Sequence, residues 1–237
     1  MAFPQVATSA TSSRDNSLTD DSVTLPASIA AGDLVMVFHY SDFGVTRTWP
    51  GSWVEIKDTN TADTGGVGAS IGIAYLIASG GETEVIVTKS IAERFAAISI
   101  RINAWHGTTP PEVSTGATGV TANPDPDTVT ASWGSADNLF IATTCYDTST
   151  NTISVWPYAS NQIAAPLVAS AGCGGICTSE IAAGSSDPGT FTITASDEWW
   201  AGTLVVRPSA GAPAEPASRL LRPNNIRPGR FKPGLAR

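Results

Sequence analysis

Few side chains in this sequence are suited to nucleophilic or acid–base chemistry. There are two histidines, and neither lies near a Ser-centred turn of the Gly-x-Ser-x-Gly type. His39 falls inside a strand-like run of apolar and aromatic residues, and His106 follows Trp105 at the end of another. Both are therefore expected to be hydrogen-bonded histidines at the surface or at a sheet edge. The sequence predicts no catalytic residue.

The three cysteines form no familiar reactive pattern. Cys145 lies in an apolar strand-like run and is expected in the core. Cys173 and Cys177 have three residues between them, so they do not match the C-x-x-C motif of redox proteins. As half of a zinc site they would need two more clustered ligands, which the sequence does not supply. A local disulfide and free thiols both remain open, and neither a metal nor a cofactor is predicted.

Acidic residues are the remaining candidates for chemistry. Two carboxylates across a cleft can hydrolyse a glycosidic bond, but they pair in space and leave no fixed spacing in the sequence. The acids that fall in turns or on polar faces are Glu82, Glu84, Glu93, Asp197 and Glu198. They are expected to be solvated turn acids. Asp58 and Asn60 resemble the start of a calcium loop, but Ala62 and Ala69 stand where oxygen ligands are needed.

Aromatic residues near turns and strand ends could instead form a sugar-binding platform. The candidate stacking residues are Trp53, Trp156 and Tyr158. Asp and Asn side chains lie nearby in the loops around 41–66 and 157–178. The alternative is that the tryptophans close the ends of the fold. Trp49 recurs at Trp156, each followed by proline, and a residue repeated at two equivalent places is most simply a packing element.

Length and composition limit the class of protein. The chain has 237 residues, of which 42% are hydrophobic and 14% charged. Seven tryptophans, seven phenylalanines and four tyrosines exclude a wholly disordered chain. The longest near-apolar run, Ile71 to Ala78, is far shorter than the roughly 20 residues needed to cross a bilayer. No apolar stretch typical of a secretory signal lies in residues 1–17, so we expect a folded protein without a membrane span.

Short runs rich in β-branched and aromatic residues dominate the sequence. They are bounded by Gly, Pro, Asp or Asn, which is the pattern of strands joined by turns. The expected strands are 34–40, 70–77, 84–88, 97–102, 139–146, 153–156, 190–194 and 203–207. Helical periodicity is absent apart from a possible single turn at Ile91–Phe95. The sequence predicts an all-β fold.

The second half of the sequence resembles the first. The run at 27–42 matches the run at 132–147 at a shift of 105 residues. The run that begins at Ile77 matches the run that begins at Ile181 at nearly the same shift. Strand order and turn residues therefore recur together, which predicts a fold built from two similar halves.

These halves suit a jelly-roll-like β-sandwich over residues 1–208. The pseudo-repeats span about 22–103 and 128–208. Two separate small sandwiches are the alternative. One domain is favoured because the link Gly107–Asp127 has little charge and four prolines that stiffen it.

Charge is divided unevenly between the body of the chain and its tail. The formal net charge is −8. Residues 1–218 hold all 21 acids and seven of the 13 bases, a balance of −14, whereas residues 219–237 hold six bases and no acid. Residues 209–218 are mainly Ala, Pro, Gly and Ser, as in a linker. The acidic body is not expected to bind the phosphates of nucleic acid.

Residues 219–237 follow a pattern of fives, in which an apolar residue is followed by a base, a proline and then Asn or Gly. Proline disfavours a helix, and Gly or Asn after it suits a turn. We expect a stiff arm that lies in a groove of another protein, with its apolar residues in slots and its cations against an acidic wall. The residues expected to dock are Leu221, Arg222, Ile226, Arg227, Arg230, Phe231, Lys232, Leu235 and Arg237. A solvated cationic tail is the alternative, and nucleic-acid binding is not expected because Phe231 is the arm's only aromatic residue.

Several motifs carry a resemblance to a known family. In the first half they are LPASIAAGDLVMVFHYSD, WPGSW, IAYLIASGGETEVIVT, AISIRINAWHG and TTPPEV; in the second they are SWGSADNLFIA and SSDPGTFTITASDEWWAGTLVVRP. Over most of residues 20–208 the chain is similar to structural proteins encoded in tailed phages and prophages. The closing RPGRFKPGLAR also looks like short basic arms at the ends of some virion proteins. The resemblance implies a β-sandwich of fibre, spike or capsid-decoration type.

The expected function is that of a non-enzymatic virion structural protein. It would be an accessory capsid-decoration protein or a tail or fibre component, attached to a capsid, portal-proximal or tail protein through the arm. We also expect it to be a homo-oligomer on the particle. One alternative is a carbohydrate-binding receptor-recognition domain on a phage fibre, which would bind a host-surface glycan. Another is an enzyme that acts on host surface polymers.

Overall fold

The computed structural model of the chain describes residues 2–42, 44–61, 68–168 and 172–210. Within these ranges the chain forms strands and no helix, so none of its described segments is a helix that could span a membrane. All strand pairings found there are antiparallel. The prediction of an all-β fold is confirmed.

The described strands form two main sheets. The first sheet contains β1 (Gln5–Thr24), β2 (Leu34–Asp42), β3 (Arg47–Thr48), β4 (Val54–Asn60), β5 (Ala69–Ile77) and β6 (Glu84–Asn103). Its order is β1-β6-β2-β5-β4, and β3 also pairs with β6. The second contains β7 (Glu112–Val113), β8 (Ala117–Gly119), β10 (Ala136–Tyr146), β12 (Ser160–Ala164), β13 (Cys173–Ala183) and β16 (Trp199–Val206). Its order is β12-β13-β10-β16-β7, and β8 also pairs with β16.

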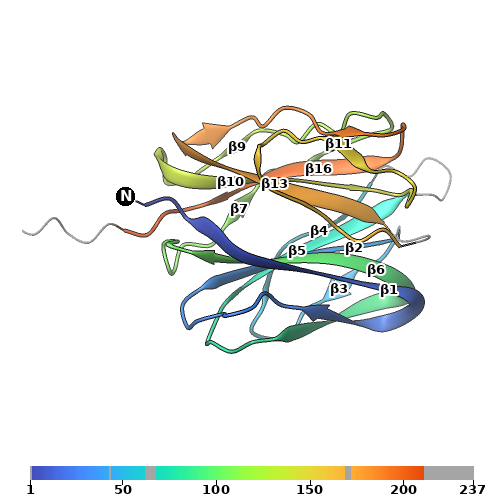
Figure 1. The fold of residues 1–237 in the computed structure, drawn as a ribbon, viewed down its shortest axis with the longest axis horizontal. Coiled ribbons are helices and arrows are strands. Elements are labelled where there is room, and N and C mark those ends of the chain that lie inside the picture. Colours follow the sequence, from blue (N-terminus) through green and yellow to red (C-terminus); the bar gives the residue numbers. More distant parts are fainter. Residues whose placement is uncertain (1, 43, 62–67, 169–171, 211–237) are drawn as a thin grey trace, which may run out of the picture.

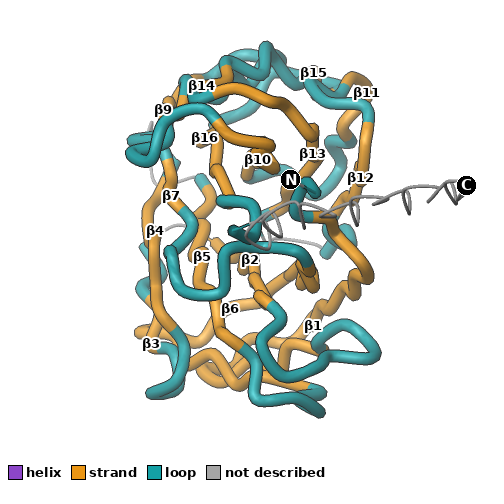
Figure 2. Tube along the Cα trace, turned by 90° about the vertical axis from the view of Figure 1, so that its left-hand side faces the viewer, coloured by secondary structure: helices purple, strands orange, loops and turns teal. Residues whose placement is uncertain are grey.

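The two main sheets stack face to face, as Figures 1 and 2 show. A hydrophobic cluster between them takes side chains from both sheets, among them Phe38 of β2, Ile141 of β10 and Leu204 of β16. Side chains on a strand alternate between its two faces. Val35 and Val37 therefore point the other way, into a separate cluster on the outer face of the first sheet. The prediction of a β-sandwich is confirmed.

The first sheet folds over its own outer face. The strands β1 and β6 each have 20 residues and stay paired along their length, with breaks in register around Leu18. Such bulges bend a pair of strands. The bend brings Val85 and Val87, near the start of β6, into the outer cluster with Ala97 of the same strand. The expected helical turn at Ile91–Phe95 is wrong, because β6 runs through it as a strand paired with β1.

The second sheet also carries an outer layer. It consists of β9 (Val129–Thr130) paired with β14 (Ser185–Ser186), and β11 (Ile153–Val155) paired with β15 (Thr192–Ile193). These short pairs lie above the second main sheet in Figure 1, on the side away from the first sheet. The sandwich therefore has a two-sheet centre with a smaller layer on each side.

The two halves follow the same plan. The strand β2 lies between β5 and β6, and β10 lies in the same way between β13 and β16. Individual positions correspond across the repeat. The matching sets of paired residues are Gly72–His39–Ala97 and Gly175–Thr144–Ala201. The prediction of two similar halves is confirmed, and each feature of one half can be compared with its counterpart in the other.

Both ends of the described chain lie at one end of the sandwich (Figure 1). Gln5 pairs with Asn103 at the start of β1. After β16, Pro208 forms an isolated bridge with Trp105. The indole Nε1 of Trp105 donates a hydrogen bond to the carbonyl of Gly32 at 2.8 Å. The chain therefore leaves the body beside the loop that joins β1 to β2.

Candidate functional site

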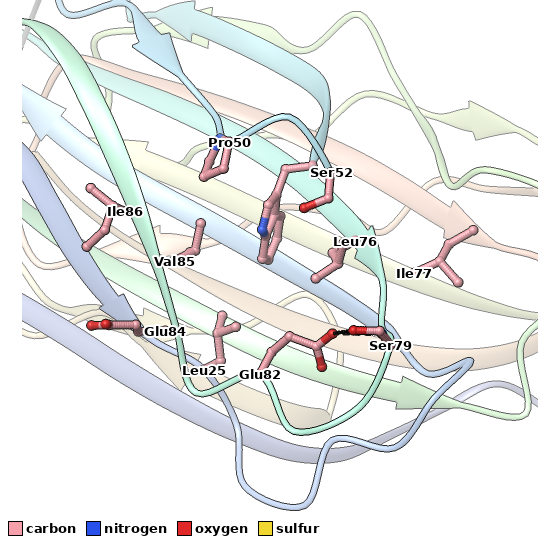
Figure 3. A pocket seen from close by; sticks show the side chains of 11 residues that line it. Leu25, Pro50, Ser52, Leu76, Ile77, Ser79, Glu82, Glu84, Val85 and Ile86 are labelled. Atoms are coloured by element: carbon pink, nitrogen blue, oxygen red, sulfur yellow. Dashed lines mark hydrogen bonds between the residues drawn. The ribbon is translucent and has the colours of Figure 1, made fainter.

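A groove lies on the outer face of the first half and encloses about 420 Å³ (Figure 3). We call it the Trp53 groove. It is lined by Leu25, Pro50, Ser52, Trp53, Leu76, Ile77, Ser79, Glu82, Glu84, Val85 and Ile86. These residues come from the loop after β1, the turn between β3 and β4, the end of β5, the start of β6 and the loop that joins β5 to β6. Its volume lies within the roughly 300–1,000 Å³ range of ligand-binding pockets.

The aromatic wall of the groove comes from the turn between β3 and β4. The amide of Trp53 donates to the carbonyl of Pro50 at 2.9 Å and closes the turn. The rings of Trp49 and Trp53 then stack, with centroids 5.9 Å apart. The indole of Trp49 donates to the carboxylate of Glu55 at 3.0 Å. This arrangement holds Trp53 half-buried against the outer cluster, with part of its ring open to solvent.

The floor of the groove is apolar. Leu25, Leu76 and Val85 are buried members of the outer cluster. At the sides, Ile77 is 45% exposed and Ile86 is 42% exposed, which is unusual for isoleucine in a folded protein. The groove therefore offers an apolar surface that the first half does not itself cover.

Two carboxylates lie at the rim. Glu82 accepts hydrogen bonds from the amide and hydroxyl of Ser79, both at 2.7 Å, and from the amide of Gly80. Partial burial acts to raise the pKa of Glu82, but these hydrogen bonds outweigh it and the pKa is lowered. Glu84 accepts a hydrogen bond from the hydroxyl of Ser22 at 2.7 Å. No lysine or arginine is among the described residues that line the groove, so the rim keeps its negative charge.

The structure does not bring the three predicted sugar-binding residues together. Trp53 packs on the outer cluster of the first half, whereas Trp156 and Tyr158 pack on the outer cluster of the second half. Trp156 meets Phe191 edge to face. Tyr158 is only 8% exposed, and its hydroxyl lies 2.6 Å from that of Ser186. The expectation that these three side chains form one platform is wrong, because they face opposite sides of the sandwich.

A second notable feature is a cluster of charged side chains buried beneath the bent strand pair of β1 and β6. Asp21 has no exposed surface, and its carboxylate lies 2.9 Å from Lys89 Nζ and 2.8 Å from His39 Nε2. Arg14 also forms an ion pair with it. The ring of His39 stacks on Phe95 with centroids 5.2 Å apart. His39 is therefore a fully buried residue of a central strand, and the expectation of a surface or edge histidine is wrong.

Arg47 completes the cluster and sets the protonation state of His39. Its Nε donates to His39 Nδ1 at 2.9 Å, so Nδ1 is an acceptor and the ring hydrogen lies on Nε2, which donates to Asp21. The other guanidinium nitrogens bind Asp58 and the carbonyl and hydroxyl of Ser70. Burial, with Arg47 among the further causes, lowers the pKa of His39 to about 4 although Asp21 opposes the shift. The imidazole is neutral at pH 7.

The second half shows that this fold does not need charges at these positions. The side chain of Arg47 lies over Gly72 of β5, and Ile153 lies over the matching Gly175 of β13. Lys89 pairs with Arg47, and Ile153 pairs with Ile193. The second half therefore has an apolar cluster where the first half has an ionic one. The ionic cluster is a property of the first half's own sequence, and its burial keeps it from contact with a dissolved substrate.

Sequence reasoning missed most of this cluster. Val85, Val87 and Lys89 alternate along β6 and lie on the same buried face. The sequence therefore contained a signal that a base is buried there. The pairing of Asp21 with His39 had no such signal, because it depends on how the paired strands β1 and β6 bend. A lysine is rarely buried unless it is paired, so a buried Lys89 implies an acidic partner elsewhere in the sequence.

Within the described residues, the structure decides between the two cysteine alternatives and shows the partners of two residues in the calcium-like motif. All three cysteines are free and buried, so the disulfide alternative is wrong and the free-thiol alternative is confirmed. Burial raises the pKa of Cys145 and Cys177 to about 12 and that of Cys173 to about 11. Asp58 is paired with Arg47, and the side chain of Asn60 accepts a hydrogen bond from Gly44.

Some of the predicted carboxylates gather at the end of the sandwich away from the chain exit. Asp147, which follows β10, lies near Asp197, Asp42 and Glu198. Burial and the neighbouring charges raise the pKa of Asp147 to about 6. Asp197 accepts hydrogen bonds from the amide of Thr148 and the side chain of Asn151, both at 2.8 Å. Acidic residues alone identify no ligand, and no group of three or more metal-binding side chains occurs in the described ranges.

Comparisons with known proteins give no match. No family model matches the chain, and neither a curated protein nor a solved structure shows significant similarity to it. A functional proposal must therefore be argued from the chain's own residues.

Proposed function

We propose that the chain is a non-enzymatic structural component of a virus particle of the tailed-phage type. Its β-sandwich body would be held on the particle by the C-terminal arm, residues 219–237, through contacts with a capsid, portal-proximal or tail protein. The resemblance described in the sequence analysis motivates this proposal, and the charge division along the chain supports the role of the arm.

The observation that carries the proposal is the division of charge along the chain, a balance of −14 in residues 1–218 against six bases and no acid in residues 219–237. The last strand, β16, ends at Val206, and the bridge between Pro208 and Trp105 follows it. All members of the four hydrophobic clusters lie between Val6 and Val206. The predicted docking residues, from Leu221 to Arg237, lie outside the described residues. The bases of the arm are thus separated in the sequence from the acidic body, as a docking segment requires.

The test is to delete residues 219–237 and to measure both folding and incorporation into particles. We expect the thermal unfolding midpoint of the truncated body to stay within a few degrees of the full chain, because the core clusters are untouched. Incorporation, measured as the amount of protein in purified particles, should be lost.

A second variant separates docking from simple charge attraction. Replacing Leu221, Ile226 and Phe231 with serine keeps all six bases of the arm. If the arm docks through its apolar residues, this variant should also be absent from particles. Normal incorporation of either variant would refute the proposal.

A further inference from the structure

We propose that the Trp53 groove receives the C-terminal arm of a second copy of this chain. The inference rests on the proposed function and names the arm's partner. Copies would then join head to tail, each arm seated on the body of its neighbour. Such a contact joins the arm of one copy to the body of another, so a reciprocal exchange closes a dimer, whereas a one-way exchange builds a ring or a filament.

The chemistry of the groove matches the repeating unit of the arm. Each unit places an apolar side chain directly before a base and a proline, as in Ile226-Arg227-Pro228. The groove places an apolar floor beside the carboxylates of Glu82 and Glu84. An apolar side chain of the arm can bind the floor while the adjacent base lies beside the carboxylates of the rim. Proline-rich segments commonly bind grooves lined by aromatic residues, and the half-exposed ring of Trp53 supplies that surface.

A peptide fits this groove better than a sugar does. A sugar needs several free hydrogen-bonding groups around it, whereas the floor and sides of the groove are Leu25, Leu76, Val85, Ile77 and Ile86. The carboxylate oxygens at the rim already accept hydrogen bonds from serine hydroxyls and backbone amides. These hydrogen bonds satisfy the oxygens but leave their negative charge, which attracts a cation.

The chain exit lies at the same end of the body as the Trp53 groove. The amide of Gly32 donates to the carbonyl of Ala78, in the loop between β5 and β6 that borders the groove, and the carbonyl of Gly32 accepts from Trp105. Trp105 in turn bridges to Pro208, so the groove and the exit lie at the same end of the body. The linker 209–218 contains Pro213 and Pro216, and proline-rich linkers extend by about 3.1 Å per residue, or roughly 30 Å here. An arm that starts at this end can therefore reach the groove of an adjacent copy, and the mixing experiment below distinguishes that contact from docking in the chain's own groove.

Two full-length variants test the proposal. Ile86→Arg places a cation in the groove at a side chain that is 42% exposed, so it should not unfold the body. The arm variant with serine at 221, 226 and 231 keeps an intact groove. In sedimentation velocity, we expect the unmodified chain to associate as its concentration rises. Each variant alone should associate at least about tenfold more weakly, because one places a cation against the arm's bases and the other removes the apolar anchors.

The matched control is Ile91→Arg. Ile91 is 46% exposed and lies on the same strand, β6, but it does not line the groove. This variant should associate like the unmodified chain. If both arginine variants weaken association equally, the effect is one of added charge and the groove is not the docking site.

Mixing the two defective variants tests whether the arm reaches a second copy. The Ile86→Arg chain has an intact arm and the arm variant has an intact groove, so together they should form a complex with one copy of each. An unmodified chain that stays monomeric, or a mixture that forms no complex, would overturn the inference. Binding of simple sugars that is lost in Ile86→Arg, without association of the chain, would assign the groove to a glycan.

The result also separates this inference from the proposed function. If the arm variant is absent from particles while Ile86→Arg is incorporated normally, the arm docks on a different virion protein. The proposed function would then stand, and the assignment of the Trp53 groove would fall.

Discussion

At the scale of single residues, the most unusual side chain is the imidazole of His39. It has no exposed surface, and it accepts a hydrogen bond from Arg47 and donates one to Asp21. Protonation of Nδ1 would break the bond from Arg47 and add a positive charge beside Arg47 and Lys89. The neutral ring is therefore part of the folded structure, and acid should act against it.

The pKa of His39 makes stability depend on pH in a defined window. Burial lowers this pKa to about 4 in the folded protein, against 6.5 in the unfolded chain. Between these values only the unfolded chain binds the proton, so stability is present above pH 6.5 and is lost as pH falls toward 4. The loss should be about 3 kcal/mol, taking 1.36 kcal/mol per unit. Urea unfolding at several pH values should show it.

A His39→Gln variant isolates this contribution. Other groups titrate in the same range, notably Asp147, whose raised pKa acts in the opposite direction. Their contributions cancel in the difference between the two proteins. The stability advantage of the native histidine should therefore shrink by about 3 kcal/mol from pH 7 to pH 4. A difference that is constant across this range would show that the ring is not held neutral.

At the scale of elements, the bent strand pair of β1 and β6 is held over the sheet by the buried ion pair of Asp21 and Lys89. Removing one partner of such a pair leaves an uncompensated buried charge. We expect Asp21→Asn to destabilise the protein by about 3–5 kcal/mol. The exposed neighbour Asp20, which accepts a hydrogen bond from Thr88, is the matched control, and Asp20→Asn should change stability by less than about 1 kcal/mol.

The second half suggests a substitution at Lys89 that should reduce the loss of stability caused by Asp21→Asn. Ile193 takes the place of Lys89 there, so Lys89→Ile should fit the strand. The double variant Asp21→Asn with Lys89→Ile should lose less stability than the sum of the single variants, with a coupling of about 1–3 kcal/mol. Strictly additive losses in equilibrium unfolding would show that the pair does not act as a unit.

How far the elements could be predicted depended on what each strand packs against. Two kinds of strand could be predicted: β5 is a nearly continuous apolar run, and the start of β6 alternates apolar and polar residues. In β1 (Gln5–Thr24) most residues are exposed and polar, so it has little hydrophobic pattern. The strand β13 begins at Cys173-Gly174-Gly175, which favours a turn, yet Gly174 is needed because a side chain there would meet Tyr40 at 2.5 Å. Close approach of this kind is visible only once the sheets are stacked.

The candidate site was less predictable than the fold. The sequence indicated Trp53, Glu82 and Glu84 separately, as an aromatic residue and two turn acids. They line one groove only because the turn between β3 and β4 and the loop between β5 and β6 lie beside the start of β6. The arm itself is readable because its spacing is local, whereas a groove depends on residues that are distant in sequence.

At the scale of the whole molecule, the two halves depend on each other for burial. The first sheet is formed by residues 5–103 and the second by residues 112–206, and the central cluster lies between them. Neither half covers its own inner face, which for the first half includes Phe38 and Ile98. If the chain were two separate small sandwiches, each half would close its own core. The stacking of the sheets argues for one cooperative unit.

The fragments 1–109 and 110–237 test this dependence. Each alone should bind a hydrophobic dye and lack a cooperative unfolding transition, because a sheet with an exposed apolar face loses its main source of stability. Mixed during refolding, they should recover a near-ultraviolet circular dichroism spectrum and a single transition. A full chain cleaved after Thr109 once folded should keep both signals, since the cut leaves the stacked sheets intact. Cooperative unfolding of either fragment by itself would instead support two independent domains.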